Sequence, residues 1–418
     1  MTQGSPRPVC MLTHSYYEED ARVRREAESL ARAGRPVDVF ALRRPGEQRQ
    51  ETVDGVHVIR LPVQRHQGAG IRTYLVEYMD FLARSMVAAT RAHRHRRYAL
   101  LQVHTLPDFL IFAGLPLRLA GRVPLVLDLH EAMPEFFCSR FGASPRSLTH
   151  RVLLAQERVS IAMASSVLTV NDTLLDRLVA LGVPRDKVTV ILNTPDLRLF
   201  DQAAGPVRPF MGDGTLRLVY AGALTPTYEL DVVLNAIGRI VASRPDIPVH
   251  ATIYGRGDAD SALRARAAEL AIADHVTFGG RIPLEQVPGV IAAADIGLAP
   301  TRRSPMTDLS LSTKVFEYAT MGKPVVASML PTVSRYFAPG TIAGYRPGDG
   351  RDLADVLIRL VDDPAERRSR SAATEARVRE LGWDVQAATY LRVIERVARD
   401  GISSGRAAPE RAGLPETL

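Results

Sequence analysis

Residues 308–326, DLSLSTKVFEYATMGKPVV, have the clearest chemical meaning in the sequence. Ser312 is placed to cap a helix, so the free backbone amides of Thr313 and Lys314 would form an anion site with the Lys314 ammonium beside them. Glu317 lies three residues further on, nearly on the same helix face, where its carboxylate could accept two hydroxyl hydrogen bonds from a ribose. The alternative for Lys314 and Glu317 is a surface ion pair. The whole segment favours a nucleotide diphosphate site.

A second group of polar residues follows the apolar runs of the first half of the chain. These residues are His14, His104, His130, Asn171 and Asn193. If the runs are parallel strands, the polar residues gather at the sheet edge where ligands of open α/β proteins bind. His130 is either a group that touches the reacting molecules or a strand-end histidine bonded to backbone. Glu131 could orient His130 or face water, and His14 is expected to be structural or to line an acceptor site.

Strands that alternate with helices must position these residues. Apolar runs predict strands at 9–14, 36–42, 100–104, 125–130, 167–171 and 188–193, and then at 216–222, 249–255, 276–279, 296–300, 324–328 and 341–346. The runs are nearly continuous, which favours parallel sheets covered on both faces. Asp20 is expected to cap the first helix and Gly34 to end it. The predicted fold class is α/β, with doubly wound domains.

The alternation breaks once, at residues 201–214, DQAAGPVRPFMGDG, which predict a linker. We therefore place one domain at 1–205 and a second at 206–383. A helix at 384–400 carries an apolar stripe, and 401–418 is expected to be disordered. Two similar domains would face each other across a central cleft, which is a common ligand site.

Composition and charge are those of an ordinary globular protein. The 418 residues include 53 Lys+Arg and 46 Asp+Glu, for a net charge of +7. Two cysteines are too few for a disulfide framework, and neither a membrane span nor a secretory core is found, so a cytoplasmic location is expected. The basic cluster from Arg91 to Arg97 either ends a solvated helix or touches an anionic partner such as the inner face of a membrane. No motif favours nucleic acid.

Asp258 and Asp260 form a D-x-D triplet that could suggest a divalent metal. The triplet opens a predicted helix, where acids suit the dipole, so capping is the preferred account and no metal or cofactor is expected. Residues 255–260 lack the full G-x-G-x-x-G spacing, which weighs against a nicotinamide dehydrogenase.

The segment STKVFEYATMGKPVVAS resembles the signature of retaining family 4 glycosyltransferases of the GT-B fold, in which two Rossmann-like domains bind acceptor and donor. DARVRREAESLARAGRPVDVF, DLHEAMPEFF and YAGALTPTYELDVVLNAI extend the resemblance over most of the chain. It implies an acceptor-side domain first and a donor domain second, with the helix 384–400 crossing back. It assigns the ribose to Glu317, sugar hydroxyls to Asp308 and contact with the reacting sugar to His130. The base would be read by backbone near Arg281 and Ile282.

The sequence departs from that family in two places. The usual pair of glutamates lies eight residues apart, but position 309 is Leu and the nearest acid, Asp308, is nine residues from Glu317. After the strand that ends in Gly222, an Arg and a Lys commonly hold the diphosphate, whereas this chain has Ala223 and Tyr228. Phosphate binding would then depend on Lys314, the helix N-terminus and basic residues nearby, for which the candidates are Arg256, Arg302 and Arg303.

The resemblance implies transfer of a hexose or N-acetylhexosamine, with retention, from a nucleotide diphosphate sugar to a hydroxyl acceptor. UDP is favoured on frequency. The acceptor could be a small molecule, a glycan or a lipid-linked compound, the last with peripheral membrane contact through residues 91–97. The alternatives are a nucleotide-sugar 2-epimerase and a non-catalytic binding subunit, the latter because the two phosphate-binding residues are missing.

Overall fold

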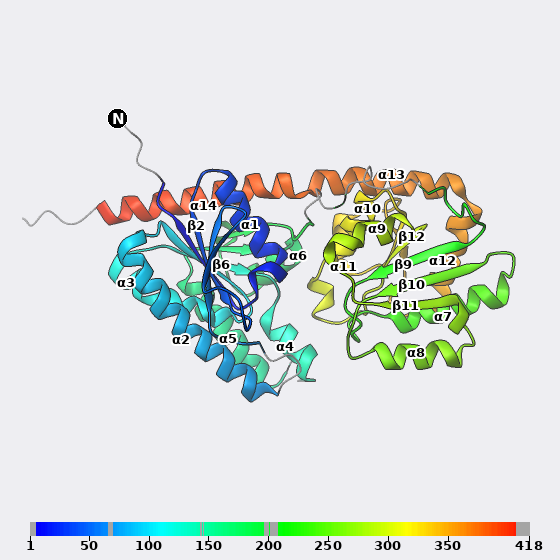
Figure 1. Cartoon of the computed structure of the whole chain (residues 1–418), viewed down its shortest axis with the longest axis horizontal. Coiled ribbons are helices and arrows are strands. Elements are labelled where there is room, and N and C mark those ends of the chain that lie inside the picture. The colour runs from blue at the N-terminus through cyan, green and yellow to red at the C-terminus, as the bar shows by residue number, and fades with distance from the viewer. Residues whose placement is uncertain are drawn as a thin grey trace, which may run out of the picture. The chain divides into compact units, whose positions relative to one another are not determined.

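The structure is a computed structural model that describes residues 6–65, 70–142, 144, 146–195, 200 and 208–406. These residues form two compact units (Figure 1). The first contains the described residues up to Val170, Leu175–Ile191 and those from Ala387 onward. The second contains Asn171–Leu174 and the described residues of Leu192–Gln386. Part of the expected linker, 201–207, and part of the expected disordered tail, 407–418, lie outside the described residues.

The first unit is built on an eight-stranded sheet with the order β3-β4-β2-β1-β5-β6-β7-β8. Its strands are β1 (Val9–Thr13), β2 (Val37–Leu42), β3 (Gln50–Val53), β4 (Val56–Leu61), β5 (Leu100–His104), β6 (Leu125–Leu129), β7 (Ser166–Thr169) and β8 (Val188–Val190). All pairs are parallel except β3 with β4. That hairpin was not predicted, although its Asp54-Gly55 turn, with positive φ at both residues, is a strong hairpin signal.

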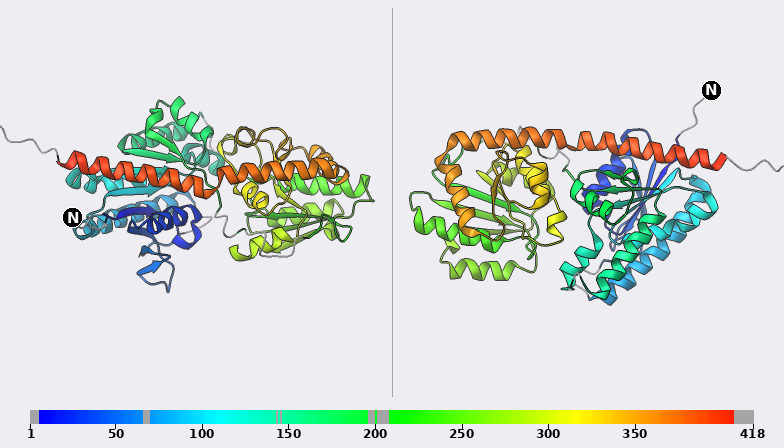
Figure 2. Two further views of the ribbon diagram at one scale, coloured as in Figure 1. Left: turned by 90° about the horizontal axis from the view of Figure 1, so that it is seen from above. Right: turned by 180° about the vertical axis from the view of Figure 1, so that it is seen from behind.

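Helices cover this sheet. They are α1 (Ala21–Arg32), α2 (Ile71–Arg96), α3 (Leu115–Gly121), α4 (Met133–Phe141), α5 (Leu148–Met163), α6 (Asp172–Ala180) and α14 (Trp383–Arg406). The predicted cap of α1 is confirmed, because the Asp20 carboxylate accepts a hydrogen bond from the Val23 amide. The prediction of disorder from residue 401 is wrong as far as Arg406, because α14 continues to that residue, and adding residues to an existing helix costs little. Figure 2 shows α14 lying along the first unit.

The second unit has a fully parallel six-stranded sheet with the order β11-β10-β9-β12-β13-β14. Its strands are β9 (Leu216–Ala221), β10 (Val249–Tyr254), β11 (Val276–Gly280), β12 (Ile296–Ala299), β13 (Val325–Ser328) and β14 (Ala343–Tyr345). Its helices are α7 (Leu230–Ser243), α8 (Asp260–Glu269), α9 (Val287–Ala292), α10 (Thr313–Thr320), α11 (Pro331–Tyr336), α12 (Gly350–Asp362) and α13 (Pro364–Leu381).

Both sheets are doubly wound, so the predicted fold class is confirmed. In the first sheet the chain runs outward in opposite directions from β1 and β5, and in the second from β9 and β12. Ligands of such sheets bind at the carboxyl ends of the strands beside this switch point. The two switch points are therefore where chemistry is expected. None of the described helices is both long and apolar enough to cross a membrane.

Candidate functional site

Helix α10 starts beside the switch point of the second sheet and buries one face, because Val315, Phe316, Tyr318 and Ala319 all point into the core. Ser312 stands at the N-cap with an extended backbone, as predicted. Its side chain makes no capping hydrogen bond, so that part of the prediction is wrong. A helix start without a side-chain cap leaves its first amides to other acceptors, and an anion is one of them.

Lys314 is buried against the end of β9. Its Nζ lies 4.3 Å from the ring centroid of Tyr228 and 5.2 Å from that of Tyr220. A Cβ atom on Gly222 would come within 2.5 Å of Lys314 Cε. The structure thus brings Gly222 and Lys314 together. It also gives a reason for Tyr228: an aromatic face stabilises the ammonium, where a second lysine would repel it.

Close backbone contact joins the ends of β9, β10 and β11. A Cβ on Gly255 would lie 1.7 Å from the Gly222 carbonyl oxygen, so only glycine fits at Gly255. The Gly222 amide donates to the Tyr254 carbonyl at 3.0 Å, and the Gly255 amide donates to the Gly280 carbonyl at 2.8 Å. Arg256 follows β10 here with an exposed side chain. Arg281, also exposed, and the half-buried Ile282 follow β11.

Two basic residues considered as phosphate ligands have other partners. Arg302 Nη2 lies 2.5 Å from Asp231, and its Nε donates to the Pro226 carbonyl. Arg303 Nε lies 3.3 Å from Asp308 Oδ1. These contacts argue against Arg302 and Arg303 as replacement phosphate ligands, and Arg256 stays a candidate. Asp308 is half-buried, and Glu317 is half-buried on α10.

His130 follows β6 in the first unit and belongs to a buried polar cluster. Its Nε2 lies 3.1 Å from Asp128 Oδ2 and 3.3 Å from His104 Nδ1. Its backbone amide donates to Thr105 Oγ1 at 3.1 Å. Asp128, not Glu131, therefore holds the His130 ring, and Glu131 is exposed. Nδ1 is the ring nitrogen with which a ligand could interact.

Arg22 sets the charge of this cluster. Its guanidinium donates to both oxygens of Asp128, at 2.8 and 2.9 Å. Burial would raise the pKa of Asp128, but Arg22 and His130 hold it well below its usual range. Burial would likewise lower the pKa of His130, but the Asp128 carboxylate raises it above its ordinary value. This shift favours the imidazolium form of the ring, which donates hydrogen bonds.

Neither Arg22 nor Asp128 was predicted from the sequence to belong to the site. A signal for Asp128 existed, since it interrupts an otherwise apolar strand, LVLDL, where a buried charge must be paired. Nothing comparable marks Arg22, because a basic residue near the start of an amphipathic helix usually faces water.

His104, Asp128 and His130 also form a group that could hold a metal ion, with ligand atoms within 4.8 Å of one another. Both Asp128 oxygens already accept hydrogen bonds from Arg22, so the charge of the carboxylate is balanced without a metal. The other metal candidate, the D-x-D triplet, opens α8 as predicted, with Asp260 in the first turn, although Ala259 is the N-cap and there is no side-chain cap bond. Asp260 pairs with Arg264 in the first turn.

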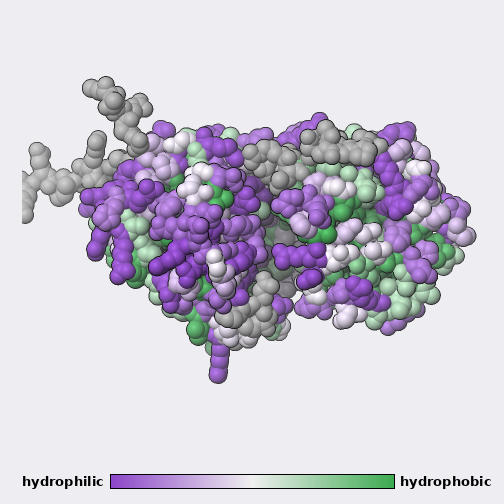
Figure 3. Space-filling model, in the orientation of Figure 1, coloured by the Kyte–Doolittle hydropathy of each residue, from purple (hydrophilic) through white to green (hydrophobic). Residues whose placement is uncertain are grey.

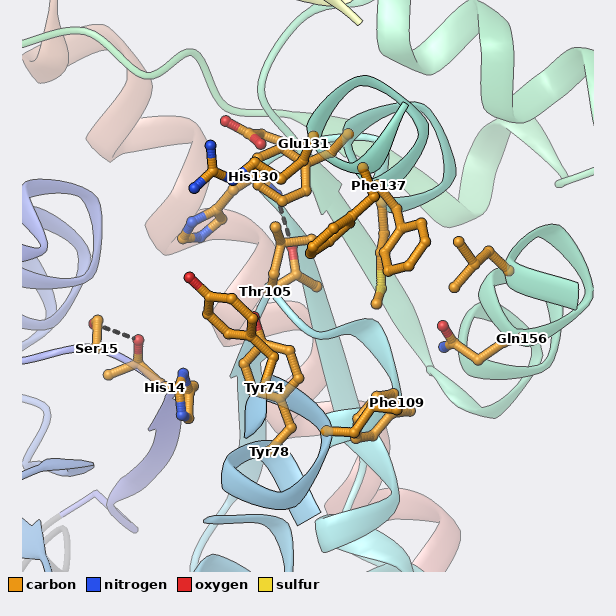
Figure 4. A pocket seen from close by; sticks show the side chains of 18 of the residues that line it. His14, Ser15, Tyr74, Tyr78, Thr105, Phe109, His130, Glu131, Phe137 and Gln156 are labelled. Atoms are coloured by element: carbon orange, nitrogen blue, oxygen red, sulfur yellow. Dashed lines mark hydrogen bonds between the residues drawn. The ribbon is translucent and has the colours of Figure 1, made fainter. Parts of the chain in front are cut away.

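His14, His130 and Glu131 line one pocket of the first unit, of about 510 Å³ (Figure 4). His14 is itself buried, with Nε2 at 3.0 Å from Glu77 Oε1 and its ring against Tyr78. Both expected roles of His14, structural and lining, are therefore compatible with its place.

Within the basic cluster 91–97, Arg96 is paired with the buried Asp38 at 2.5 Å and so has a structural contact.

Comparisons with known proteins match the two halves of the chain to two different families. Residues 20–194 match the glycosyl transferase 4-like domain family, and residues 215–363 match the glycosyl transferases group 1 family. D-inositol 3-phosphate glycosyltransferase of Thermomonospora curvata is 28% identical over 88% of this chain and 87% of its own. GDP-mannose-dependent monoacylated alpha-(1-6)-phosphatidylinositol monomannoside mannosyltransferase of Corynebacterium glutamicum is 28% identical over 42% of this chain and 46% of its own. Sucrose-phosphate synthase of Thermosynechococcus elongatus has the same fold, with a TM-score of 0.75, 18% identity, and 94% and 100% of the two chains covered.

Proposed function

Because the chain belongs to the family 4 glycosyltransferases with the GT-B fold, we propose that it moves a hexose or N-acetylhexosamine from a nucleotide diphosphate sugar to a hydroxyl acceptor. The observation that carries the donor class is the meeting of Lys314 with Gly222 where α10 begins, beside the switch point of the second sheet. A buried ammonium and a helix N-terminus together suit a diphosphate.

In this proposal, different groups of the chain bind the different parts of the donor. Ser312 at the N-cap, the first amides of α10 at Thr313 and Lys314, and the Lys314 ammonium bind the diphosphate. Glu317 accepts hydrogen bonds from the ribose, and Asp308 accepts them from the sugar. The backbone at Arg281 and Ile282 contacts the base, while Arg256 adds positive charge at the end of β10.

The reaction proposed is a substitution with retention at the anomeric carbon. The acceptor oxygen bonds to that carbon on the face from which the phosphate oxygen departs, and the acceptor proton passes to the leaving phosphate. His130 donates a hydrogen bond to a sugar hydroxyl or to the acceptor, because Asp128 favours its protonated form. Positive charge from Lys314 and the helix start would serve in place of a metal.

The base and the acceptor are open within this class. UDP is favoured on frequency alone, whereas the relative from Corynebacterium glutamicum is named for GDP-mannose. The relatives named above act on an inositol phosphate and on a phosphatidylinositol mannoside, which supports a small-molecule or lipid-linked acceptor.

Thermal-shift titration of the purified chain with UDP, GDP, ADP and dTDP, in the presence of EDTA, tests the donor site. One nucleotide is expected to raise the unfolding midpoint, because a ligand at a hundred times its Kd stabilises by about 2.7 kcal/mol. Glu317→Ala should remove most of that shift by removing the ribose contact. Glu269→Ala is the matched control, since this glutamate is exposed on α8 and its ion-pair partner among the described residues is Arg266, on the same helix.

A wild-type protein that no nucleotide stabilises would contradict the proposed donor class. A shift that requires a divalent cation would contradict metal independence alone. A shift that survives in Glu317→Ala would leave the donor class standing but remove the role of Glu317.

A further inference from the structure

The pocket beside His130 is lined mainly by aromatic and aliphatic side chains. Tyr74, Tyr78, Phe109, Phe137 and Phe141 form a connected series of rings, with centroid separations of 6.2 Å for Tyr74 and Tyr78, 6.2 Å for Tyr78 and Phe109, 6.5 Å for Tyr74 and Phe141, and 4.5 Å for Phe137 and Phe141. Figure 4 shows Tyr74, Tyr78, Phe109 and Phe137 gathered around the same space. A free sugar presents hydroxyls on most sides, and burying them against such walls costs free energy.

Polar groups cluster at one end of this pocket, although Arg140 and Gln156 also line it. Ser15, Thr105 and His130 line it there, and Figure 4 shows them on the side away from Phe109 and Gln156. Ser15 Oγ donates to Asp20, and Thr105 Oγ1 accepts from the His130 amide, so both hydroxyls are held in place. A ligand with one polar end and one apolar end matches this division.

We propose that the acceptor carries an apolar body, either an aryl group or an alkyl chain, which lies among these rings while its hydroxyl reaches the polar end near His130. This inference rests on the proposed glycosyl transfer and specifies its acceptor. The volume of about 510 Å³ lies within the range of pockets that enclose drug-sized ligands. It therefore has room for an apolar body as well as a polar head.

The rim of the pocket is open and apolar as well. Leu75, Phe141 and Val152 line the pocket and yet are 50%, 40% and 58% exposed. In the view of Figure 3, by contrast, hydrophilic residues cover most of the visible face of the first unit. Apolar side chains that remain both solvent-exposed and pocket-lining are suited to a ligand that covers them on binding.

Calorimetric titration of the full chain with butyl, hexyl and octyl glucosides, below their micelle concentrations, tests the proposal. Kd should fall by about fourfold for each methylene that becomes buried, since each contributes about 0.8 kcal/mol. Glucose should bind far more weakly than the octyl glucoside. A Kd that does not depend on chain length would overturn the proposal.

A pair of matched double variants locates the binding. Leu75→Asp with Val152→Asp places charges at the rim of the pocket and should weaken octyl glucoside binding at least tenfold. Val76→Asp with Leu148→Asp alters the same two helices at positions that are 71% and 73% exposed and do not line the pocket. This second variant should bind as the wild type does. Equal losses in both variants, or no loss in either, would overturn the proposal.

Two further measurements separate the possible sources of failure. The thermal shift caused by the nucleotide should persist in both double variants. If the wild type shows no nucleotide shift, the proposed function is contradicted. If the wild type shows the nucleotide shift but its Kd for alkyl glucosides does not depend on chain length, only the proposal for the pocket is contradicted. Cosedimentation with phosphatidylglycerol vesicles that Val76→Asp with Leu148→Asp abolishes would assign the apolar body to a membrane lipid. Absence of cosedimentation in the wild type would assign it to a diffusible amphiphile, and the chain-length dependence is required in either case.

Discussion

The end of the Lys314 side chain lies directly beside Gly222. The ammonium of Lys314 occupies the volume that any side chain at position 222 would need, and the ring of Tyr228 fixes it there. The atoms that would clash belong to the far end of a flexible side chain, which can move aside at low cost. A substitution at Gly222 therefore displaces the charge without disrupting the core.

Gly222→Ala should weaken nucleotide binding about tenfold, equivalent to about 1.4 kcal/mol, because the ammonium leaves its place. The unfolding midpoint without ligand should change little. Gly238→Ala is the control, since a Cβ there would meet its neighbours at no less than 3.8 Å. Kd values measured by calorimetry decide the matter, and an unchanged Kd in Gly222→Ala would mean that Lys314 does not bind the phosphates.

His130 should make stability depend on pH. Its pKa is raised in the folded state, through Asp128, so its protonation stabilises the fold fully below the ordinary pKa of 6.5 and is lost as pH rises through the folded value. The free energy of unfolding should therefore fall over this range by about 1.4 kcal/mol for each unit of elevation. Urea unfolding at a series of pH values measures it.

His130→Gln should flatten this part of the pH profile, whereas His95→Gln, at an exposed position on α2, should retain it. The comparison isolates His130 from Asp128, His104 and Arg22, which remain in both variants. If His130→Gln and wild type share one profile between neutral and mildly alkaline pH, then Asp128 does not raise the pKa of this ring.

The sequence predicts single residues well when a local rule decides their place. The cap at Asp20 follows from its position before an amphipathic helix, and the start of α10 at Ser312 follows from a contiguous motif. The ion pair of Arg22 with Asp128 could not be predicted in this way, because it joins residues 106 positions apart. Such a pair depends on how α1 packs on β6, which only the folded chain determines.

At the scale of elements, a chain of buried hydrogen bonds links α14 to the cluster at His130. Tyr390 of α14 donates to Gln102 of β5 at 2.8 Å, and Gln102 donates to Glu26 of α1 at 2.6 Å. Glu26 lies 3.1 Å from the Nε of Arg22, which in turn binds Asp128. The last helix thus supports the residues that hold His130.

Tyr390→Phe should lower the free energy of unfolding by about 1–3 kcal/mol, because the buried Gln102 carbonyl oxygen loses its donor. Tyr254→Phe serves as the matched control, since no hydrogen bond to a described residue involves the Tyr254 hydroxyl. Denaturant unfolding, monitored by circular dichroism, provides both values. Equal stability of the two variants would show that water replaces the lost donor.

Elements were predictable where hydrophobic runs were long. Each predicted strand is present, and most end within two residues of the predicted bounds, because a strand buried on both faces must be apolar throughout. Strand β8 ends at Val190, three residues early, and both β3 and β4 were missed. Strand β4 alternates apolar and polar residues in a short run, and β3 has only exposed or half-buried residues at a sheet edge. An edge strand carries little apolar signal, so only its turn could have indicated it.

At the scale of the whole molecule, the described residues form two hydrophobic cores, one in each unit. One cluster of buried residues includes Leu127 in the first unit, and the other includes Ile237 in the second. Each switch point is positioned by its own sheet. The groups proposed for the donor and those proposed for the acceptor therefore belong to different units.

Hydrogen exchange with each ligand tests this division. The nucleotide that stabilises the wild type should slow exchange at residues 222–224, 255–257 and 313–316, because bound amides and their neighbours open less often. Octyl glucoside should instead slow exchange in 74–78 and 133–141. Mass spectrometry of the two complexes provides both maps from one protein. If the nucleotide protected the ends of β1 and β6 rather than that of β9, the donor would belong to the first unit, and Lys314 would have to be reassigned to the stability of α10.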